Sequence, residues 1–278
     1  MPMPDRSHRL GAGIDAGTEC VKAVVVEPSG RIRGRAVVPT TGYFETAAQA
    51  ALAAALEDAQ LDLGDLAVVA ATGFGAECVP NAVVTVAETA AHARGAFAHR
   101  RSPMTVIDIG GRDPKAITVD ARGRRVDART TRRCAMGIGT FLAFTARHLD
   151  VHPSRLQELA ATAESPAVIS SYCSVFAGTE VLERLRNGAR REEIALGCIH
   201  SIAERIIEIG ALEPPLVATG GVPEYFPGVV RELSRLLGSE VEVIPEPIVA
   251  GAVGAALLAL EAGEGERKGG DGAAQASS

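Results

Sequence analysis

The chain has 278 residues, of which 47% are hydrophobic and 22% charged, the composition of an ordinary soluble globular protein. Its net charge of −6 gives no reason to expect nucleic acid as a partner, and its longest nearly apolar run, Ile248–Leu260, is too short to span a membrane. The first ten residues lack the apolar core of a secretory signal, so we expect a cytoplasmic protein whose five cysteines are thiols, metal ligands or redox groups rather than disulfides.

From the N-terminus, the first notable segment is Ile14–Arg31, because it is repeated later in the chain. The repeated residues keep a constant offset (108 − 15 = 93); they are Asp15, Gly17, Lys22, Ala23, Val26, Gly30 and Arg31, which recur as Asp108, Gly110, Lys115, Ala116, Val119, Gly123 and Arg124. Seven identities at one register, with no gap, indicate an internal duplication.

Each copy has the pattern of a three-stranded meander. A buried strand ends at the aspartate, a turn with glycine follows, and the lysine leads the second strand; Gly30 and Gly123 then mark the turn to a third strand. Free backbone N–H groups beside a carboxylate suit a phosphate and its Mg²⁺. Two matching turns therefore predict a nucleotide held from both sides, although most glycine turns in meanders are only turns.

Helices and strands alternate through the rest of the sequence. The expected helices span residues 45–60, 87–97, 155–162, 175–187, 192–210, 225–237 and 248–260, with one more opened by Cys134–Gly139 and ending near Leu149; the expected strands span 66–71, 83–86, 214–219 and 241–244. Ser154 is the expected N-cap of the helix at 155–162.

This order of elements predicts an α/β protein with two domains. The first domain is expected at residues 10–103, completed by a C-terminal helix at 246–262, and the second at residues 104–245. Residues 1–9 and 263–278 are expected to be disordered ends.

With two Asp–Gly–Lys turns and a strand that ends in Ala218-Thr219-Gly220-Gly221-Val222, the chain resembles the superfamily of actin, sugar kinases and heat-shock chaperone ATPases. The resemblance implies two duplicated actin-like (ribonuclease H-like) ATPase domains with ATP in the cleft between them. The nucleotide contacts that it implies are Asp15, Gly17, Thr18 and Lys22 in the first phosphate turn, Asp108, Gly110, Gly111, Arg112 and Lys115 in the second, and Gly220 and Gly221 at the adenosine.

Two cysteine-containing segments support a narrower resemblance. They read Cys134-Ala-Met-Gly137-Ile-Gly139-Thr-Phe-Leu and Ser171-Tyr-Cys173-Ser-Val-Phe-Ala-Gly178-Thr-Glu180-Val, and they are similar to the BadF/BadG/BcrA/BcrD family. Asp108-Ile-Gly-Gly-Arg-Asp113-Pro-Lys115 and Ala71-Thr72-Gly73 agree with it, and the similarity runs from about residue 11 to 260. This family contains the ATP-dependent activators of 2-hydroxyacyl-CoA dehydratases and the ATPase subunits of benzoyl-CoA reductase.

The family resemblance implies an ATP-hydrolysing electron carrier. One 4Fe–4S cluster would be held by Cys134 and Cys173 of two subunits, in a homodimer or with a paralogous subunit, and Gly137, Gly139 and Glu180 lie in the same two motifs. Ferredoxin or flavodoxin would donate the electron, and an acyl-CoA dehydratase or reductase would receive it.

The resemblance also implies roles for the charged residues of the two turns. Asp15 and Asp108 would hold Mg²⁺ through water, and Asp108 or Asp113 would orient the water that attacks the phosphate. Lys22 and Lys115 would lie near the phosphates, unless they only cover the strand surface. The chain departs from the usual family pattern at Glu19, Arg112 and Gly178.

The chemistry of the two cysteines agrees with a shared cluster. Cys134 and Cys173 each precede a predicted helix, and a helix N-terminus favours the thiolate that binds metal. Two thiolates cannot complete a tetrahedral set, whereas a two-fold dimer supplies four. The alternative is that both are small structural residues. The other cysteines are assigned no chemistry, and His92 and His200 are interpreted as surface or capped-core histidines.

Two other functions remain open from the sequence. One is a sugar or acetamidosugar kinase of the same fold with structural cysteines, which needs a sugar-binding cluster of Asp, Asn and His that we do not find in the sequence. The other is an ATP-switched assembly or chaperone-like module, which needs a partner-binding extension.

Overall fold

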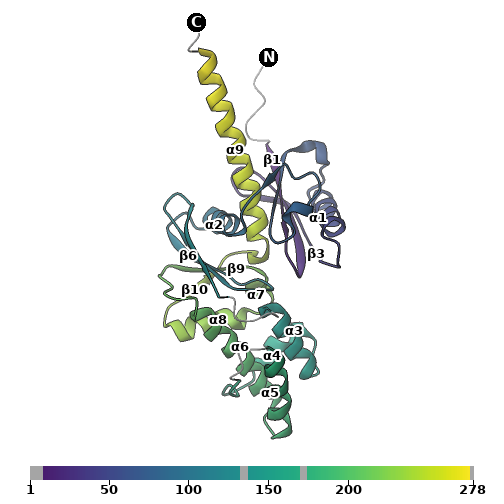
Figure 1. Cartoon of the computed structure of the whole chain (residues 1–278), viewed down its shortest axis with the longest axis vertical. Coiled ribbons are helices and arrows are strands. Elements are labelled where there is room, and N and C mark those ends of the chain that lie inside the picture. Colours follow the sequence, from purple (N-terminus) through teal and green to yellow (C-terminus); the bar gives the residue numbers. More distant parts are fainter. Residues whose placement is uncertain (1–8, 132–136, 170–173, 276–278) are drawn as a thin grey trace. The chain divides into compact units, whose positions relative to one another are not determined.

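The computed structural model describes residues 9–131, 137–169 and 174–275, which divide into two compact units. Unit 1 consists of Met1–Arg101, Gly123–Arg125 and Val249–Ser278, and unit 2 consists of Ser102–Arg122 and Val126–Ile248. Each unit is built on its own five-stranded sheet (Figure 1).

The sheet of unit 1 has the strand order β3-β2-β1-β4-β5. Its first three strands form the predicted meander, and β1 is antiparallel to β2 but parallel to β4. The elements are β1 (Leu10–Ala16), β2 (Cys20–Val26), β3 (Ile32–Pro39), α1 (Phe44–Ala59), β4 (Leu66–Thr72), β5 (Val84–Thr85), α2 (Glu88–His99) and the C-terminal helix α9 (Ala250–Gln275), with 3-10 turns at Leu63–Asp65 and Ala76–Cys78.

The sheet of unit 2 has the order β8-β7-β6-β9-β10, the same topology with each strand replaced by its counterpart. Again β6 is antiparallel to β7 and parallel to β9. The elements are β6 (Met104–Asp108), β7 (Lys115–Val119), β8 (Arg125–Thr130), α3 (Ile138–His148), α4 (Pro153–Ala160), α5 (Ser174–Arg186), α6 (Arg191–Ile207), β9 (Leu216–Thr219), α7 (Gly221–Tyr225), α8 (Pro227–Leu237) and β10 (Val241–Val243), followed by a 3-10 turn at Pro247–Val249. The duplication predicted from the sequence is thus a duplication of the whole sheet.

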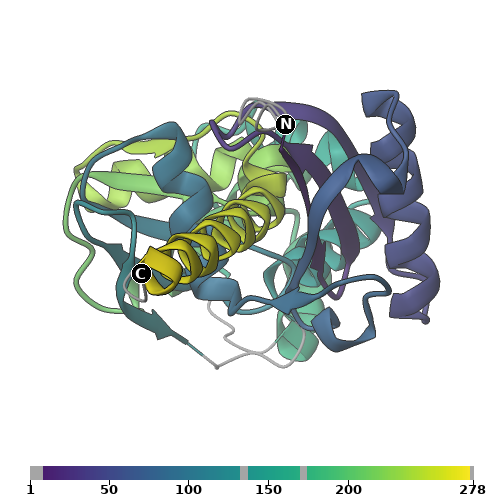
Figure 2. The same cartoon turned by 90° about the horizontal axis from the view of Figure 1, so that it is seen from above.

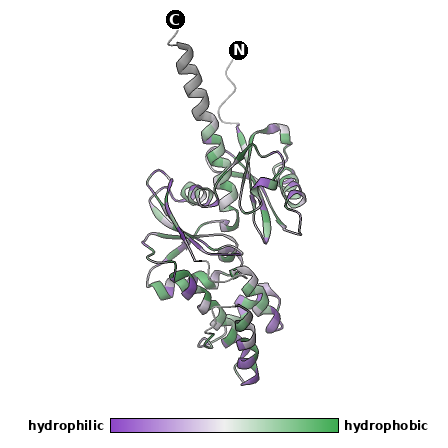
Figure 3. Ribbon diagram, in the orientation of Figure 1, coloured by the Kyte–Doolittle hydropathy of each residue, from purple (hydrophilic) through white to green (hydrophobic). Residues whose placement is uncertain are grey.

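In unit 1 the sheet is a middle layer, with α1 on one face and α2 and α9 on the other (Figure 2). The residues of β1 alternate between the two faces of the sheet: Ile14 and Ala16 pack toward α1, while Gly13 and Asp15 face α9. A Cβ on Gly13 would collide with the carbonyl oxygen of Ala252, so glycine lets α9 pack directly on the strand. The part of α9 beside the strands is mainly hydrophobic in Figure 3.

The core of unit 2 lies between its sheet and the helices α3, α4, α6 and α8. The aliphatic residues of α6 are central to it, and Phe141 and Leu142 of α3 are fully buried there. A membrane-spanning helix, which needs a long apolar stretch, is not found in the part of the chain that the structure describes.

Three elements differ from the sequence prediction. Helix α9 continues to Gln275, past Gly263, where disorder is predicted; a helix already anchored by packing propagates easily, and no proline follows to stop it. The helix predicted at 225–237 is two helices, because Pro227 occupies the first turn of α8 and α7 ends at Tyr225. Helix α4 is capped by His152, whose ring accepts from the Ser154 backbone, and not by Ser154 itself.

Candidate functional site

The first predicted phosphate turn, in unit 1, is organised around an ion pair. Asp15 of β1 lies directly opposite Lys22 of β2, and Lys22 Nζ donates to Asp15 Oδ2 at 3.0 Å. Both side chains are largely buried. A Cβ on Gly17 would lie 2.8 Å from Lys22 Nζ, so glycine at this position makes room for the lysine side chain. Thr18, in the same turn, is half-buried. A cation and a carboxylate at one strand end suit a phosphate and a hydrated Mg²⁺.

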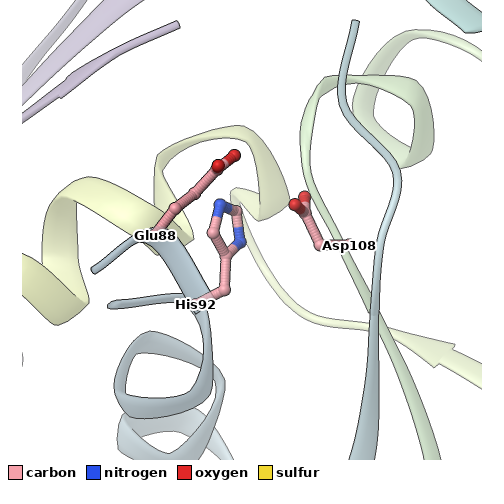
Figure 4. Close-up of side chains that lie close together, drawn as sticks. All are labelled: Glu88, His92 and Asp108. Carbon is pink, nitrogen blue, oxygen red and sulfur yellow. The ribbon is translucent and has the colours of Figure 1, made fainter. Parts of the chain in front are cut away.

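Unit 2 repeats this pair. Asp108 closes β6 opposite Lys115 of β7, and Lys115 Nζ donates to Asp108 Oδ2 at 3.4 Å. The Asp108 side chain is almost fully buried, and Figure 4 draws it at the end of its strand. The two aspartates and two lysines that the sequence predicts therefore occupy the same place in each unit.

A second repeated feature lies beside each aspartate, and the sequence analysis did not recognise it as a repeat. In parallel register, Thr72 of β4 is the partner of Asp15, and Thr219 of β9 is the partner of Asp108. All four side chains are buried. The signal is the tripeptide Ala-Thr-Gly at the end of an apolar strand, which occurs at 71–73 and again at 218–220.

The glycine of each tripeptide lies against the aspartate. Gly73 has φ +88° and Gly220 has φ +99°, both in the region that favours glycine. A Cβ on Gly73 would collide with Asp15 Oδ1, and a Cβ on Gly220 would lie 2.8 Å from Asp108 Oδ1. The resemblance assigns Gly220 to the adenosine. In unit 2, Gly220 also lies directly against the Asp108 carboxylate. A Cβ added to Gly221 would lie 3.8 Å from the Ile248 side chain, which is an ordinary contact.

The second phosphate turn is bonded to the start of α3. The Ile138 N–H donates to the Arg112 carbonyl and the Gly139 N–H to the Gly111 carbonyl, each at 3.2 Å. Gly137, with φ +77°, packs so closely on Gly111 that a Cβ would collide with the Gly111 carbonyl oxygen. Gly137 and Gly139, which the sequence analysis places in the cysteine motif, are therefore also contacts of the phosphate turn.

The remaining predicted residues are spread more widely. Space is open around Gly110, the Arg112 side chain is exposed and Asp113 is half-buried in the turn before β7. Glu180 lies on α5, where it accepts from Arg184 at 3.4 Å. Cys134 and Cys173 lie outside the described residues.

The cysteines assigned no chemistry have ordinary structural surroundings. Cys198 is fully buried in the core of unit 2, where burial raises the pKa of its thiol to about 11. Burial also raises the pKa of Cys20, against the opposing effect of the Lys22 ammonium. Cys78 is exposed.

His92 is not a surface histidine, because only 3% of it is exposed. It projects from α2 one turn after Glu88, as Figure 4 shows, and a Cβ added to Gly251 of α9 would lie 2.9 Å from its Nε2. The same added Cβ would lie 3.3 Å from Asp15 Oδ2, so His92 belongs to the surroundings of the first phosphate turn.

Comparison with known proteins identifies the family. Residues 12–259 match the BadF/BadG/BcrA/BcrD ATPase family. The chain belongs to this family. The chain is also similar to an activator of lactoyl-CoA dehydratase from Anaerotignum propionicum. The two are 38% identical over 91% of this chain and 98% of that protein.

Solved structures agree with the BadF/BadG/BcrA/BcrD assignment. The activator of the 2-hydroxyisocaproyl-CoA dehydratase from Clostridium difficile, with bound ADPNP, has a TM-score of 0.85 and 31% identity, covering 93% of this chain and 97% of that one. A ROK family glucokinase from Streptomyces griseus has a TM-score of 0.57 and 16% identity over 90% of this chain and 98% of its own, and this likeness shows the shared actin-like fold alone. The glucokinase is thus the less similar of these two structures.

Proposed function

We propose that this ATPase-family protein is a reductive activator, in which ATP hydrolysis drives one electron from a 4Fe–4S cluster to a partner enzyme of the 2-hydroxyacyl-CoA dehydratase or benzoyl-CoA reductase type. The observation that carries the proposal is the pair of matching half-sites, each with a buried Asp–Lys pair beside a Thr–Gly edge, in a chain of the BadF/BadG/BcrA/BcrD family. The likeness to an activator of lactoyl-CoA dehydratase favours a dehydratase as the partner.

The residues of the half-sites fit ATP with Mg²⁺. Asp15 and Asp108 are buried carboxylates at strand ends, the place where a hydrated Mg²⁺ is held through its water. The carboxylate beside each lysine holds the ammonium at the strand end, and there the ammonium would face a phosphate. Asp108 or Asp113 would orient the attacking water.

The cluster would be shared between two chains. Cys134 and Cys173 supply two thiolates, and four are needed, so we propose a homodimer, or a dimer with a paralogous subunit, in which one cluster bridges the subunits. The bound cluster would supply a one-electron carrier, charged by ferredoxin or flavodoxin. The neighbouring helices support this: α5 begins at Ser174, one residue after Cys173, and Gly137, three residues after Cys134, is the N-cap of α3.

The coupling that we propose passes through backbone contacts. A change at the second phosphate turn reaches Gly111 and Arg112, whose carbonyls accept from the first N–H groups of α3. We therefore propose that α3 moves in response to hydrolysis. About 59 mV for one electron corresponds to roughly 1.4 kcal/mol, so a few kcal/mol of coupling shifts a potential by a hundred millivolts or more.

Anaerobic purification with iron and acid-labile sulfide analysis tests the proposal. We expect roughly four irons and four sulfides per dimer, and a brown protein that transfers an electron to its partner only with ATP. Cys134→Ala is expected to abolish the cluster and electron transfer while ATP binding persists. A colourless, iron-free protein after full anaerobic reconstitution would refute the cluster, and a protein that forms ADP only with a sugar acceptor, which it phosphorylates, would establish a kinase instead.

A further inference from the structure

The buried polar side chains of unit 1 share one face of its sheet. Among the described residues of this unit they are Asp15, Thr72 and His92. Asp15 and Thr72 are register partners on adjacent strands, so their side chains project to the same face, the one that α2 and α9 cover. His92 reaches this face from α2. Three elements therefore each contribute a buried polar group to this face.

The hydroxyl of Thr72 lacks a partner inside the described chain. It is fully buried, and Oγ1 forms no hydrogen bond with any described residue. Buried hydroxyl groups are normally satisfied, as at Thr105, whose Oγ1 donates to the Glu213 carbonyl at 2.8 Å. The unsatisfied oxygen beside Asp15 points to a polar ligand that the chain itself does not supply.

Gly251 of α9 packs closely against the other two polar groups of this face. A Cβ added to Gly251 of α9 would lie 2.9 Å from His92 Nε2 and 3.3 Å from Asp15 Oδ2, so the imidazole and the carboxylate both border the position of the missing methyl. A helix normally prefers alanine to glycine by about 1 kcal/mol, so this glycine carries a cost within α9. Glycine at this position lets α9 approach the imidazole and the carboxylate closely.

We propose that Thr72 and His92 are positioning residues that accept hydrogen bonds from the water shell of the Mg²⁺ carried by the nucleotide phosphates. Mg²⁺ gives up its water reluctantly and is usually held through it, and each metal-bound water needs an acceptor. Asp15 supplies the charge, Thr72 Oγ1 a further oxygen, and His92 Nε2 a nitrogen close to Gly251. This inference rests on the proposed binding of ATP.

Calorimetric titration of the full chain with ADP tests the inference, run once with Mg²⁺ and once with EDTA. The readout is the gain in ADP affinity that Mg²⁺ brings. Thr72→Val keeps the branched shape but removes the hydroxyl, and we expect it to reduce the gain about tenfold while metal-free binding stays unchanged. Thr72→Ser restores a hydroxyl and should restore the gain. Thr105→Val is the matched control: it makes the same change at a buried threonine outside this face, and should keep the gain.

A second variant tests the same group of polar residues from α9. Gly251→Ala places a methyl between His92 and Asp15, and should also reduce the Mg²⁺-dependent gain; Gly263→Ala, on the same helix but with only ordinary contacts around an added Cβ, should not. If the parent protein binds ADP with a Mg²⁺-dependent gain and Thr72→Val keeps all of it, the inference is wrong while the proposed function stands. If the parent binds no adenine nucleotide under either condition, the proposed function fails and the inference with it.

Discussion

The backbone N–H of Gly139 donates to the carbonyl oxygen of Gly111 across 3.2 Å, so the first turn of α3 rests directly on the second phosphate turn. Gly137 packs against the same carbonyl with φ +77°, a conformation that favours glycine. The second phosphate turn and the start of α3 are therefore joined by backbone hydrogen bonds and by a close glycine contact.

Gly137→Ala is expected to disrupt the contact between the second phosphate turn and the start of α3. The new methyl would collide with the Gly111 carbonyl, so we expect a loss of about 2–3 kcal/mol in the free energy of unfolding, together with weaker ADP binding. Urea denaturation and ADP titration measure both effects. Gly188→Ala is the control, since Gly188 has φ +85° but open space around an added Cβ. It should lose only the backbone strain and keep its ADP affinity; equal ADP affinity in both variants would contradict the contact's role.

Asp108→Asn is expected to lower ATP hydrolysis about a hundredfold or more, because the amide cannot carry the charge that we propose faces Mg²⁺ and the attacking water. The side chains are nearly equal in size, so ADP binding should change far less than turnover. Steady-state phosphate release measures the effect. Asp127→Asn, which alters an exposed carboxylate on β8, should hydrolyse ATP like the parent. Full turnover by Asp108→Asn would remove Asp108 from the mechanism.

Cys198 should resist alkylation in the folded protein. Burial raises the pKa of its thiol to about 11, so at pH 8 about one molecule in a thousand carries the reactive thiolate, and the core of unit 2 blocks access to it. Iodoacetamide labelling followed by peptide mass spectrometry should find Cys78 modified and Cys198 unmodified, with Cys198 reacting only after denaturation. Rapid labelling of native Cys198 would mean that this core opens readily.

Glu232 should contribute stability that disappears in acid. Hydrogen bonds from Arg235, and then from His200 at 2.5 Å, lower the pKa of Glu232 below its ordinary 4.5. A lowered pKa in the folded state stabilises the protein above the unfolded-state pKa, and this contribution is lost as the pH falls through the folded-state value.

Glu232→Gln is therefore expected to be less stable than the parent at pH 7, with the difference narrowing as the pH falls below 4.5. Urea denaturation at a series of pH values measures this, and Glu240→Gln, at an exposed position, is the control. A constant difference between parent and variant at all pH values would show that the charge of Glu232 is not involved.

The local parts of the site could be predicted from the sequence, and the long-range parts could not. The Asp15–Lys22 and Asp108–Lys115 pairs follow from hairpins, in which sequence spacing sets the register. Thr72 joins Asp15 only because β4 pairs in parallel with β1 after a long connection, and no local pattern sets that register. The burial of His92 likewise depends on how α2 packs against α9.

The helix boundaries show the same division. The ends of most helices follow periodicity within a few residues, but the cap of α4 was misassigned, because both His152 and Ser154 carry a side chain able to cap and the choice depends on local geometry. The separate helix α7 was missed because five residues are too few to show a period.

The two copies of the duplicated sheet differ most in one connection. Between its third and fourth strands unit 1 has a single α-helix, α1, whereas unit 2 has α3, α4, α5 and α6 among its described residues. Both candidate cluster ligands, Cys134 and Cys173, fall within that longer connection. Because it begins after β8 and ends before β9, a change in its length leaves every strand pair intact. Under the proposed function, the duplication let one copy take on a redox role, while both copies keep the edge of Asp, Thr and Gly at which we place the phosphates.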